Sequence, residues 1–409
     1  MTIGVGGSQA GRELERLGDM TAGTSPIGIK EYAARIKRAQ KIMQEMNITA
    51  LYVNAGTNMT YFTGTKWGPS ERMVGAVIPV NGEIAYIAPA FEIGTLQQYM
   101  GIKGNVQGWE EHESPYDIFQ KILQNIAERA GAAGNRIALD ESCPFFISNG
   151  IALAAPEFDY INGSSITAPC RQIKSPNELA LMQRVKDMTL EVHKAAARIL
   201  RAGITAKEVG DFIHAAHIKV GAPAGSYFVI VLFGEDTAYP HGVKNPKPLS
   251  ENDMVLIDTG CQLHGYISDI TRSYVYGEPN ARQRQVWDIE KQAQAAAFDQ
   301  AQVGTRCGDV DLAARACLEE HQLGPDYRLP GLPHRTGHGI GLDIHEWPYL
   351  NSGDDTLLEP GMCFSNEPMI CVPGEFGIRL EDHFFMTEDG PRWFTVPSHS
   401  IDDPFGYEK

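Results

Sequence analysis

The chain has 409 residues, 43% of them hydrophobic, and a formal net charge of −16 at pH 7. This length exceeds what one hydrophobic core needs and predicts two domains. The excess of acidic side chains repels phosphate backbones and anionic lipids, and the chain lacks a run of about 18 apolar residues, so we expect neither nucleic acid nor a membrane as a partner.

The sequence before residue 173 predicts a tail followed by an α/β layer. Residues 1–24 are rich in Gly, Ser and charged side chains, which predicts a loose tail. Asn81-Gly82 between two apolar runs is a strong β-hairpin signal. The predicted elements are, in chain order, a helix over 29–46, a strand over 50–53, hairpin strands over 74–80 and 84–87, a helix over 116–130, a turn at 131–134 and a strand over 137–139. We assign residues 25–172 to this first domain.

A second pattern begins at a helix-start signature. Ser175 at the cap, Pro176 at the first helical position and Glu178 at the third are typical of a capping box. We therefore place the domain boundary near Ile173 and assign residues 173–409 to the second domain. Its predicted elements are helices over 179–200 and from 205, strands over 227–233, 254–259 and 266–276, helices over 282–302 and 310–321, and strands over 362–367 and 378–386. Helices outside antiparallel strands indicate an α+β fold.

The cysteines indicate a reducing compartment. There are seven, an odd number, and they are irregularly spaced without a Cys-x-x-Cys pair. This pattern favours neither a disulfide framework nor a structural zinc site. We therefore expect reduced thiols and a cytoplasmic protein.

Five acidic or imidazole side chains lie within or beside apolar strand patterns of the second domain. They are Asp258, Asp269, His338, Glu367 and Glu381. One such acid alone would usually face solvent or be hydrogen-bonded, but four carboxylates that meet one imidazole repel each other unless cations lie between them. Oxygen-rich ligands with one imidazole suit a pair of divalent ions. Two ions about 3.5–4 Å apart share a water, lower its pKa and hold a carbonyl oxygen.

The spacing of the four acids supports their convergence. Asp258 and Asp269 are 11 residues apart, with a turn at His264-Gly265 between them. Glu367 and Glu381 flank the turn-forming segment 372–377. Two antiparallel hairpins would bring each pair of carboxylates together and provide matching halves of one site.

The chain resembles a known family at these positions. The segments DTGCQLHGYISDITR, HRTGHGIGLDIHE, NEP and GIRLED occur in the order and spacing of the pita-bread metallopeptidases, which include methionine aminopeptidase, Xaa-Pro aminopeptidase and prolidase. The match covers roughly residues 175–400, and the region before it resembles the creatinase-type N-terminal domain of the proline-specific members. The resemblance implies a C-terminal pita-bread catalytic domain, a smaller α/β creatinase-like N-terminal domain and a homodimer.

The resemblance also implies a role for each of the five side chains. Asp269 and Glu381 would bridge two metal ions. Asp258 would complete the shell of one ion, and His338 with Glu367 that of the other. Glu367 would in addition act as general base. We expect Mn²⁺ in both positions, with Co²⁺ or Zn²⁺ as alternatives.

Four further residues match the family pattern. Seen alone, each would be an ordinary core or surface group. The resemblance implies that His241 and His345 bind the substrate and stabilise the oxyanion. It implies that His334 lines the pocket for the proline side of the substrate. Arg379 would be a charge partner beside the metals.

Two departures from the family pattern affect the substrate side. Cys371 stands where the family often has a tyrosine that assists the transition state, and a thiol is a poor replacement donor. Several prolidases carry an arginine for the substrate carboxylate within the stretch that corresponds to residues 346–366, and none occurs there. Arg335 is one candidate for that task. Arg72, near Trp67 on the N-terminal domain of a partner subunit, is another.

Within the family the chain most resembles bacterial Xaa-Pro dipeptidases, which implies a metallopeptidase that hydrolyses the Xaa-Pro bond in dipeptides, with a short proline-containing peptide as substrate. The bond before proline has no N–H, so a pocket selects it by shape and by the missing donor. Two other hydrolytic activities stay open, namely an Xaa-Pro aminopeptidase that acts on longer peptides and a hydrolase of other small amides on the same scaffold. A metal-free binding protein of the creatinase type is disfavoured because all five ligand types are present.

Overall fold

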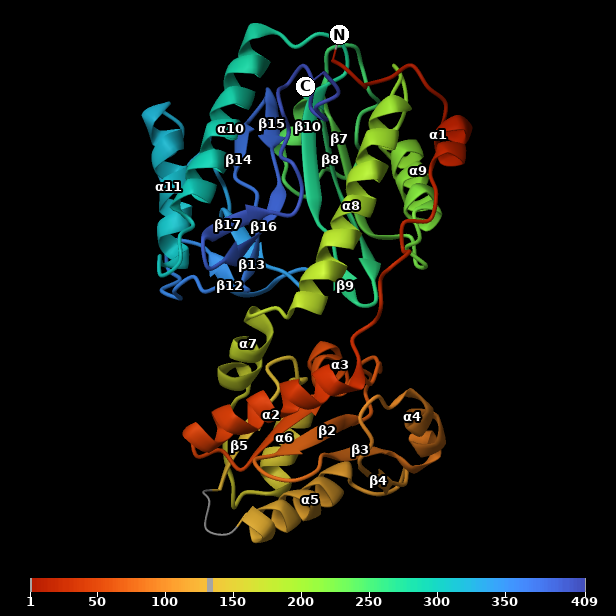
Figure 1. Ribbon diagram of the computed structural model, residues 1–409, viewed down its shortest axis with the longest axis vertical. Coiled ribbons are helices and arrows are strands. Elements are labelled where there is room, and N and C mark those ends of the chain that lie inside the picture. The colour runs from red at the N-terminus through yellow and green to blue at the C-terminus, as the bar shows by residue number, and fades with distance from the viewer. Residues whose placement is uncertain (1, 131–134, 409) are drawn as a thin grey trace. The chain divides into compact units, whose positions relative to one another are not determined.

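The computed structural model describes residues 2–130 and 135–408 (Figure 1). The turn predicted at 131–134 lies outside the described residues. The chain forms two compact units, one of Pro26–Arg171 and one that combines Met1–Ser25 with Gln172–Lys409. Helices and sheets occur in both units, so the predicted α+β fold class is confirmed.

The smaller unit is built on one mixed sheet with the strand order β4-β3-β2-β1-β5-β6. The central strand β1 pairs antiparallel with β2 and parallel with β5. The predicted hairpin at Asn81-Gly82 is confirmed, since β2 and β3 pair antiparallel on either side of it. The elements are α2 (Ile29–Glu45), β1 (Ala50–Asn54), α3 (Thr57–Thr63), β2 (Gly75–Pro79), β3 (Ala85–Pro89), η1 (Ala90–Glu92), α4 (Ile93–Tyr99), β4 (Asn105–Trp109), α5 (Pro115–Ala130), β5 (Arg136–Leu139), α6 (Phe145–Ala154), β6 (Asp159–Asn162) and α7 (Ser164–Gln172).

One part of the core of the smaller unit lies between this sheet and the helices α5 and α6. Side chains alternate across β1, so Ala50 and Tyr52 face the same side of the sheet. Tyr52 packs edge-on against Phe119 of α5, with ring centroids 5.1 Å apart, and Ile151 of α6 belongs to the same buried cluster. Burial of these side chains accounts for the strand and helix periodicities of the sequence.

The larger unit consists of antiparallel strands with helices outside them. Its strands form sheets of order β10-β8-β7, with β9 beside β8, and β12-β11-β13-β16-β17, and a β14-β15 ribbon. The elements are α1 (Ala10–Arg16), α8 (Pro176–Arg198), α9 (Ala206–Lys219), β7 (Ser226–Phe233), η2 (Gly234–Ala238), β8 (Met254–Leu263), β9 (Tyr266–Ile267), β10 (Ile270–Val275), α10 (Ala281–Gln300), α11 (Cys307–Glu320), β11 (Gly337–Gly339), β12 (Glu346–Leu350), β13 (Cys363–Asn366), β14 (Met369–Val372), β15 (Phe376–Arg379), β16 (Asp382–Thr387) and β17 (Gly390–Trp393).

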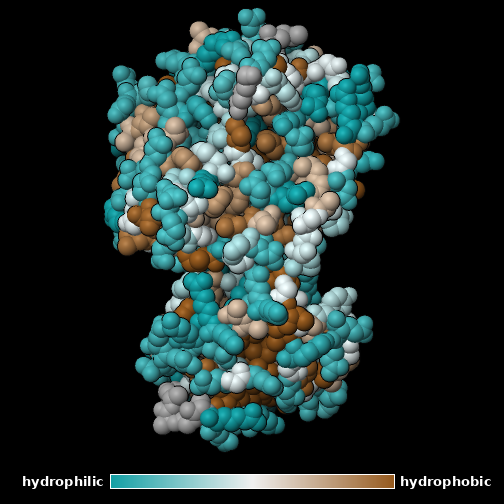
Figure 2. Space-filling model, in the orientation of Figure 1, coloured by the Kyte–Doolittle hydropathy of each residue, from teal (hydrophilic) through white to brown (hydrophobic). Residues whose placement is uncertain are grey.

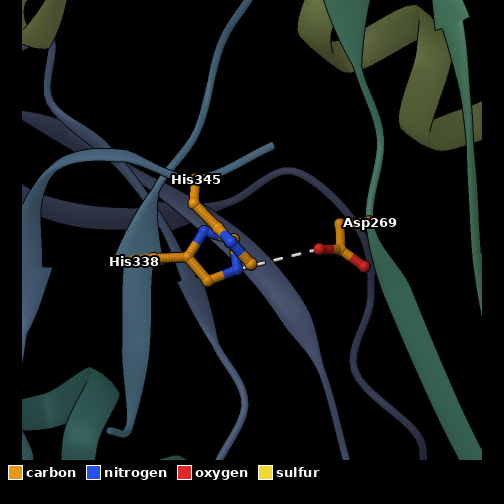
Figure 3. A group of neighbouring side chains, drawn as sticks. All are labelled: Asp269, His338 and His345. Atoms are coloured by element: carbon orange, nitrogen blue, oxygen red, sulfur yellow. Dashed lines mark ion pairs between the residues drawn. The ribbon is translucent and has the colours of Figure 1, made fainter. Parts of the chain in front are cut away.

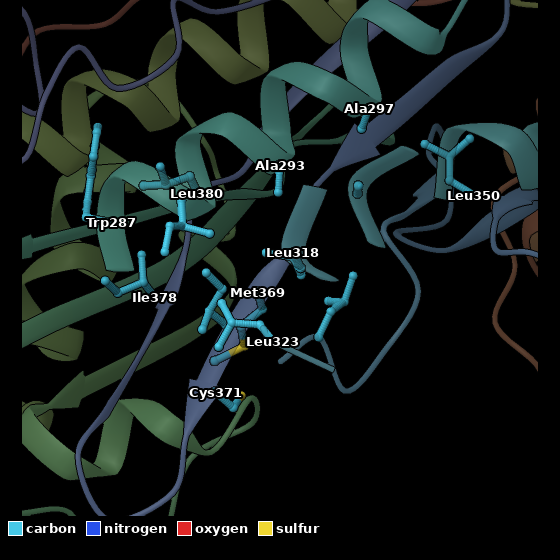
Figure 4. Packing of buried hydrophobic residues seen from close by; sticks show 14 of the residues in the cluster. Trp287, Ala293, Ala297, Leu318, Leu323, Leu350, Met369, Cys371, Ile378 and Leu380 are labelled. Carbon is cyan, nitrogen blue, oxygen red and sulfur yellow. The ribbon is translucent and has the colours of Figure 1, made fainter. Parts of the chain in front are cut away.

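Two pairs of helices cover the two groups of strands. Helices α8 and α9 pack on β7 and β8, and α10 packs with α11 over β13 to β15 (Figure 1). Helix α8 begins at the predicted capping box, in which the Ser175 hydroxyl accepts from the Glu178 N–H and the Glu178 carboxylate accepts from the Ser175 N–H. Figure 4 shows the apolar face of α10 beside β14 and β15, with Trp287, Ala293, Ala297, Met369, Cys371, Ile378 and Leu380.

The prediction of a loose N-terminal tail is wrong for the described residues of that segment. The carboxylate of Glu13 on α1 is fully buried and forms ion pairs of 2.7 Å with both Arg16 and Arg198. The Thr2 and Ile3 N–H groups donate to backbone carbonyls near residues 277 and 402. The Gly- and Ser-rich composition gave no sign of this packing because Arg198 and the accepting carbonyls lie far away in the sequence.

The face seen in Figure 2 is mainly polar. Figure 2 shows polar side chains over most of the visible face of each unit, with apolar side chains gathered in smaller patches. Among the described residues, no helix combines the length and the apolar character that crossing a bilayer requires.

Candidate metal centre

Asp258 and Asp269 come from one hairpin of the larger unit. Asp258 lies on β8 opposite Thr271 of β10, and Asp269 lies between β9 and β10. The predicted turn is present, since His264 and Gly265 both have positive φ angles, 51° and 99°, and join β8 to β9. The strands after this turn return beside β8 and place both carboxylates on the same part of the sheet.

The close approach within this hairpin requires a glycine. A Cβ atom on Gly260 would lie 1.7 Å from the backbone oxygen of Ser268, the residue before Asp269. Backbone atoms cannot yield as a flexible side chain can, so any other residue at 260 would displace Asp269.

His338, Glu367 and Glu381 come from the second group of strands. His338 lies on β11 opposite Tyr349, and Glu367 directly follows β13. The strand predicted over 378–386 is in fact broken at Leu380-Glu381, where the chain leaves β15 and enters β16 in a different sheet. At this break the Glu381 N–H donates to the Thr271 carbonyl at 3.2 Å, and the Thr271 hydroxyl donates to Glu381 Oε2 at 2.8 Å.

The acidic and imidazole groups from the two halves meet. His338 Nε2 lies 3.0 Å from Glu367 Oε1 and 3.7 Å from Asp269 Oδ2. The donor atoms of His338, Glu367 and Glu381 lie within 4.8 Å of one another, as ligands of one ion would. Four of the five predicted ligands are at most 6% exposed, and 14% of the Glu367 side chain is exposed. Asp258 is not a member of this group or of the other two groups of donor atoms that lie within 4.8 Å of one another, which are Asp269 with His338 and His345, and Asp269 with Glu381 and His383. It pairs instead with Arg379.

The electrostatics of this cluster favour bound cations. Burial, reinforced by the neighbouring carboxylates, raises the pKa of Asp269 and Glu381 well above the ordinary values, and burial also raises the pKa of Asp258. Burial acts in the same direction on Glu367, but the hydrogen bond and charge of His338 override it and lower the pKa of Glu367. Asp258 Oδ1 and Glu381 Oε1 are buried without a hydrogen-bond partner. Unpartnered carboxylate oxygens around one centre are the donor set that divalent cations require.

Arg379 is a buried partner of this cluster and not a surface arginine. It is 3% exposed, its Nη2 pairs with Asp258 Oδ2, and its Nε donates to the Thr271 hydroxyl at 2.9 Å. Burial would lower the pKa of Arg379, but the charges of Asp258 and the neighbouring acids override that effect and raise it. The guanidinium therefore stays charged and orients Asp258.

The three other predicted histidines differ in burial and in their contacts with the acidic cluster. The ring of His345 lies edge-on to that of His338, with centroids 4.3 Å apart, and Figure 3 shows both rings with Asp269 opposite them. His334 Nδ1 lies 2.7 Å from the Arg335 carbonyl oxygen, and its buried Nε2 has no hydrogen-bond partner. His241 is exposed on the turn after η2. Burial, with smaller charge effects that include His241, lowers the pKa of His345 to about 4 and also lowers that of His334.

Two buried residues near the cluster were missed by sequence reasoning. His383 is fully buried on β16, and its Nε2 lies 3.3 Å from Glu381 Oε1. Lys186 is fully buried on α8, and burial lowers its pKa to about 8. The available signals were weak. His383 is two residues past Glu381 and so shares its side of an extended chain, and Lys186 interrupts the buried face of α8 four residues after Met182.

The departures from the family pattern have distinct surroundings. Cys371 lies in the hydrophobic core beside α10, 1% exposed, and burial raises its pKa to about 12 (Figure 4). The guanidinium of Arg335 lies 4.3 Å from the centroid of the Tyr349 ring. On the smaller unit, Arg72 forms an ion pair of 3.0 Å with Glu111. The charge of Arg72 is therefore already compensated within its own unit.

Known proteins match the chain over both units. A family model described as metallopeptidase family M24 matches residues 180–388, and one described as the creatinase/prolidase N-terminal domain matches residues 35–173. The Xaa-Pro dipeptidase of Lactobacillus delbrueckii subsp. lactis is 30% identical over 368 residues, which is 90% of this chain and 98% of that protein.

Solved structures show the same two-domain architecture. The dipeptidase PepE from Mycobacterium ulcerans superposes with a TM-score of 0.84 at 29% identity, over 92% of this chain and 98% of that one. The prolidase from Thermococcus sibiricus superposes with a TM-score of 0.79 at 27% identity, over 89% and 97% of the two chains. The chain therefore belongs to metallopeptidase family M24, the pita-bread peptidases, and carries the creatinase-type N-terminal domain.

Proposed function

We propose that this protein is a two-metal Xaa-Pro dipeptidase, a prolidase. One observation carries the proposal: three carboxylates (Asp269, Glu367 and Glu381) and His338 offer donor atoms in overlapping groups, each within 4.8 Å. The fourth carboxylate, Asp258, is buried beside them with an unpartnered oxygen, and Glu381 has another. The relatives named as dipeptidases, Xaa-Pro dipeptidases and prolidases support the substrate class.

The residues fit two divalent ions, which we propose to be Mn²⁺. Asp269 and Glu381 would bridge the ions, Asp258 would complete one shell, and His338 with Glu367 the other. When bound, the ions supply Lewis-acid polarisation of the scissile carbonyl and acidify a water. The mixed oxygen and imidazole donors suit Mn²⁺ and also accept Co²⁺ or Zn²⁺.

The chain's own residues supply the proton chemistry. The contact with His338 keeps Glu367 ionised at neutral pH, so its carboxylate accepts a proton from the attacking water and passes it to the departing proline nitrogen. His345 is neutral at pH 7 and still carries one N–H, which can donate to the oxyanion together with His241. His334, half-buried beside this group, would line the pocket for the proline ring.

A dipeptidase also needs a cation for the free carboxylate of its substrate, and we propose Arg335. It follows His334 directly, is half-buried, and has no ion-pair partner among the described residues. Its position over Tyr349 holds the planar guanidinium, which suits a bidentate contact with a carboxylate. Arg72 of a partner subunit is the competing candidate.

The test is a substrate panel with and without added Mn²⁺. The proposal expects metal-dependent cleavage of Ala-Pro, slower cleavage of Ala-Pro-Ala, and little cleavage of Ala-Ala. Faster cleavage of the tripeptide would instead support an Xaa-Pro aminopeptidase, and activity restricted to a cyclic amide would support another small-amide hydrolase. Lack of peptide cleavage with every divalent ion tested would refute both peptidase assignments.

Arg335→Ala and Arg72→Ala provide matched variants for the carboxylate contact. The loss of a charge-assisted hydrogen bond costs about 1.5–3 kcal/mol, which is about 10- to 150-fold in kcat/KM. We expect Arg335→Ala to lose this much on Ala-Pro, mostly through KM, with Arg72→Ala unaffected. The opposite pattern would assign the contact to Arg72.

The assembly and location are further proposals. We propose a homodimer, as the family resemblance implies, in the cytoplasm, as the cysteine pattern indicates. All seven cysteines are unpaired in the described residues, which agrees with a reducing compartment. Light scattering on the purified protein measures the oligomeric state directly.

A further inference from the structure

His383 is a buried histidine whose ring nitrogens lack hydrogen bonds. It lies on β16 opposite Ser365 of β13 and is 0% exposed. Neither Nδ1 nor Nε2 has a hydrogen-bond partner among residues 2–130 and 135–408. Burying such polar atoms without partners costs free energy, so a residue placed in this way points to a partner that the polypeptide does not supply.

The direction of the ring indicates the kind of partner. Nε2 lies 3.3 Å from Glu381 Oε1, but the two atoms do not form a hydrogen bond, since an N–H on this nitrogen would not point at the oxygen. A ring nitrogen of His383 also lies within 4.8 Å of ligand oxygens of both Asp269 and Glu381. When a nitrogen and an oxygen lie this close without a hydrogen bond between them, their arrangement matches that of two adjacent ligands of one ion. For bonds of about 2.1 Å at a right angle, adjacent ligand atoms lie about 3.0 Å apart.

We propose that His383 is a sixth protein ligand of the metal centre, donating Nε2 to one of the two ions that Asp269 and Glu381 would bridge. This inference rests on the proposed two-metal function. The five predicted ligands include one imidazole, that of His338, and His383 would add a second. A second nitrogen donor strengthens the preference of that position for Co²⁺ or Zn²⁺ relative to Mn²⁺.

The test compares His383→Leu with the wild type by Co²⁺ titration, following the heat of binding and the visible d–d absorption. We expect the wild type to bind two Co²⁺ ions. We expect the variant to lose at least about 10-fold in affinity for one of them, the lower bound set by the loss of an outer-shell partner, and to change its d–d bands. His217→Leu is the matched control, because His217 is equally buried but its nitrogens contact Thr189 and Ser226.

Unfolding without metal separates ligation from a structural role. Because the His383 nitrogens have no protein partners, metal-free His383→Leu should be at least as stable as the metal-free wild type. His217→Leu should be less stable and bind Co²⁺ normally. If His383→Leu does not fold, His383→Gln is titrated in its place.

The outcomes are distinguishable. Wild-type affinity and spectrum in the His383 variant would overturn the inference and leave the proposed function intact. Weaker binding with an unchanged spectrum would also overturn it, because His383 would then act only through Glu381. Failure of the wild type to bind two ions would overturn the two-metal function itself.

Discussion

The ion pair between Arg379 and Asp258 allows a quantitative test of the site's electrostatics. The two residues are 3% and 6% exposed, so solvent screens the pair very little. Arg379→Met keeps much of the side-chain volume but leaves the buried carboxylate of Asp258 without its partner. Breaking a buried pair in this way costs about 3–5 kcal/mol. At about 2–4 °C per kcal/mol for a domain of this size, the melting temperature should fall by about 6–20 °C.

The assay is urea and thermal unfolding of the protein in a chelator, repeated with saturating Mn²⁺. Bound ions compensate the charge of Asp258, so the loss should be smaller with metal. Arg282→Met is the control, because Arg282 forms a 3.1 Å pair with Glu375 in which both side chains are 44% exposed. An exposed ion pair contributes about 0–1 kcal/mol to the free energy of unfolding, so Arg282→Met should lose no more than this.

The single variant Asp258→Asn and the double variant Asp258→Asn/Arg379→Met complete a double-mutant cycle with Arg379→Met. If the two residues stabilise each other, the double variant should be more stable than the sum of the single losses predicts, by at least about 1.5 kcal/mol. A metal-free loss for Arg379→Met no larger than that for Arg282→Met would refute this account of the site.

Three further predictions concern catalysis, pH and metal removal. Glu367→Gln should lower kcat by about 10²–10⁴ in steady-state assays, with an unchanged circular dichroism spectrum; near-normal turnover would exclude Glu367 as the base. Burial raises the pKa of the fully buried Glu290 well above its ordinary 4.5. Folded Glu290 therefore keeps its proton where the unfolded chain has released it, so this contribution to stability is present below about pH 4.5 and is lost as the pH rises through the folded pKa. Glu290→Gln should accordingly raise the melting temperature more at pH 8 than at pH 4, and equal shifts would contradict this. Chelation should lower the melting temperature, and Mn²⁺ at 100 times its Kd should restore about 2.7 kcal/mol by calorimetry; an unchanged transition would indicate that no ion binds the folded site.

Much of the secondary structure could be read from local patterns. The capping box at Ser175 and the turn at His264-Gly265 depend on residues within a few positions of each other, and both occur where they were predicted. The strand over 378–386 was predicted as continuous because its apolar pattern is continuous. It breaks at Glu381, where hydrogen bonds from and to Thr271 draw the chain between two sheets. Those bonds join residues 110 positions apart.

The sequence by itself determined the two-part organisation, the order of the hairpins and the residue types that a metal centre needs, because periodicity, turn chemistry and ligand chemistry are local properties. Only the tertiary structure decided that the N-terminal segment packs through Glu13, that Arg379 pairs with Asp258, and that His383 lies near Asp269. Each of these depends on burial and on contact between distant segments. A buried charge must find a partner wherever the fold places one, and that place has no signature in the neighbouring sequence.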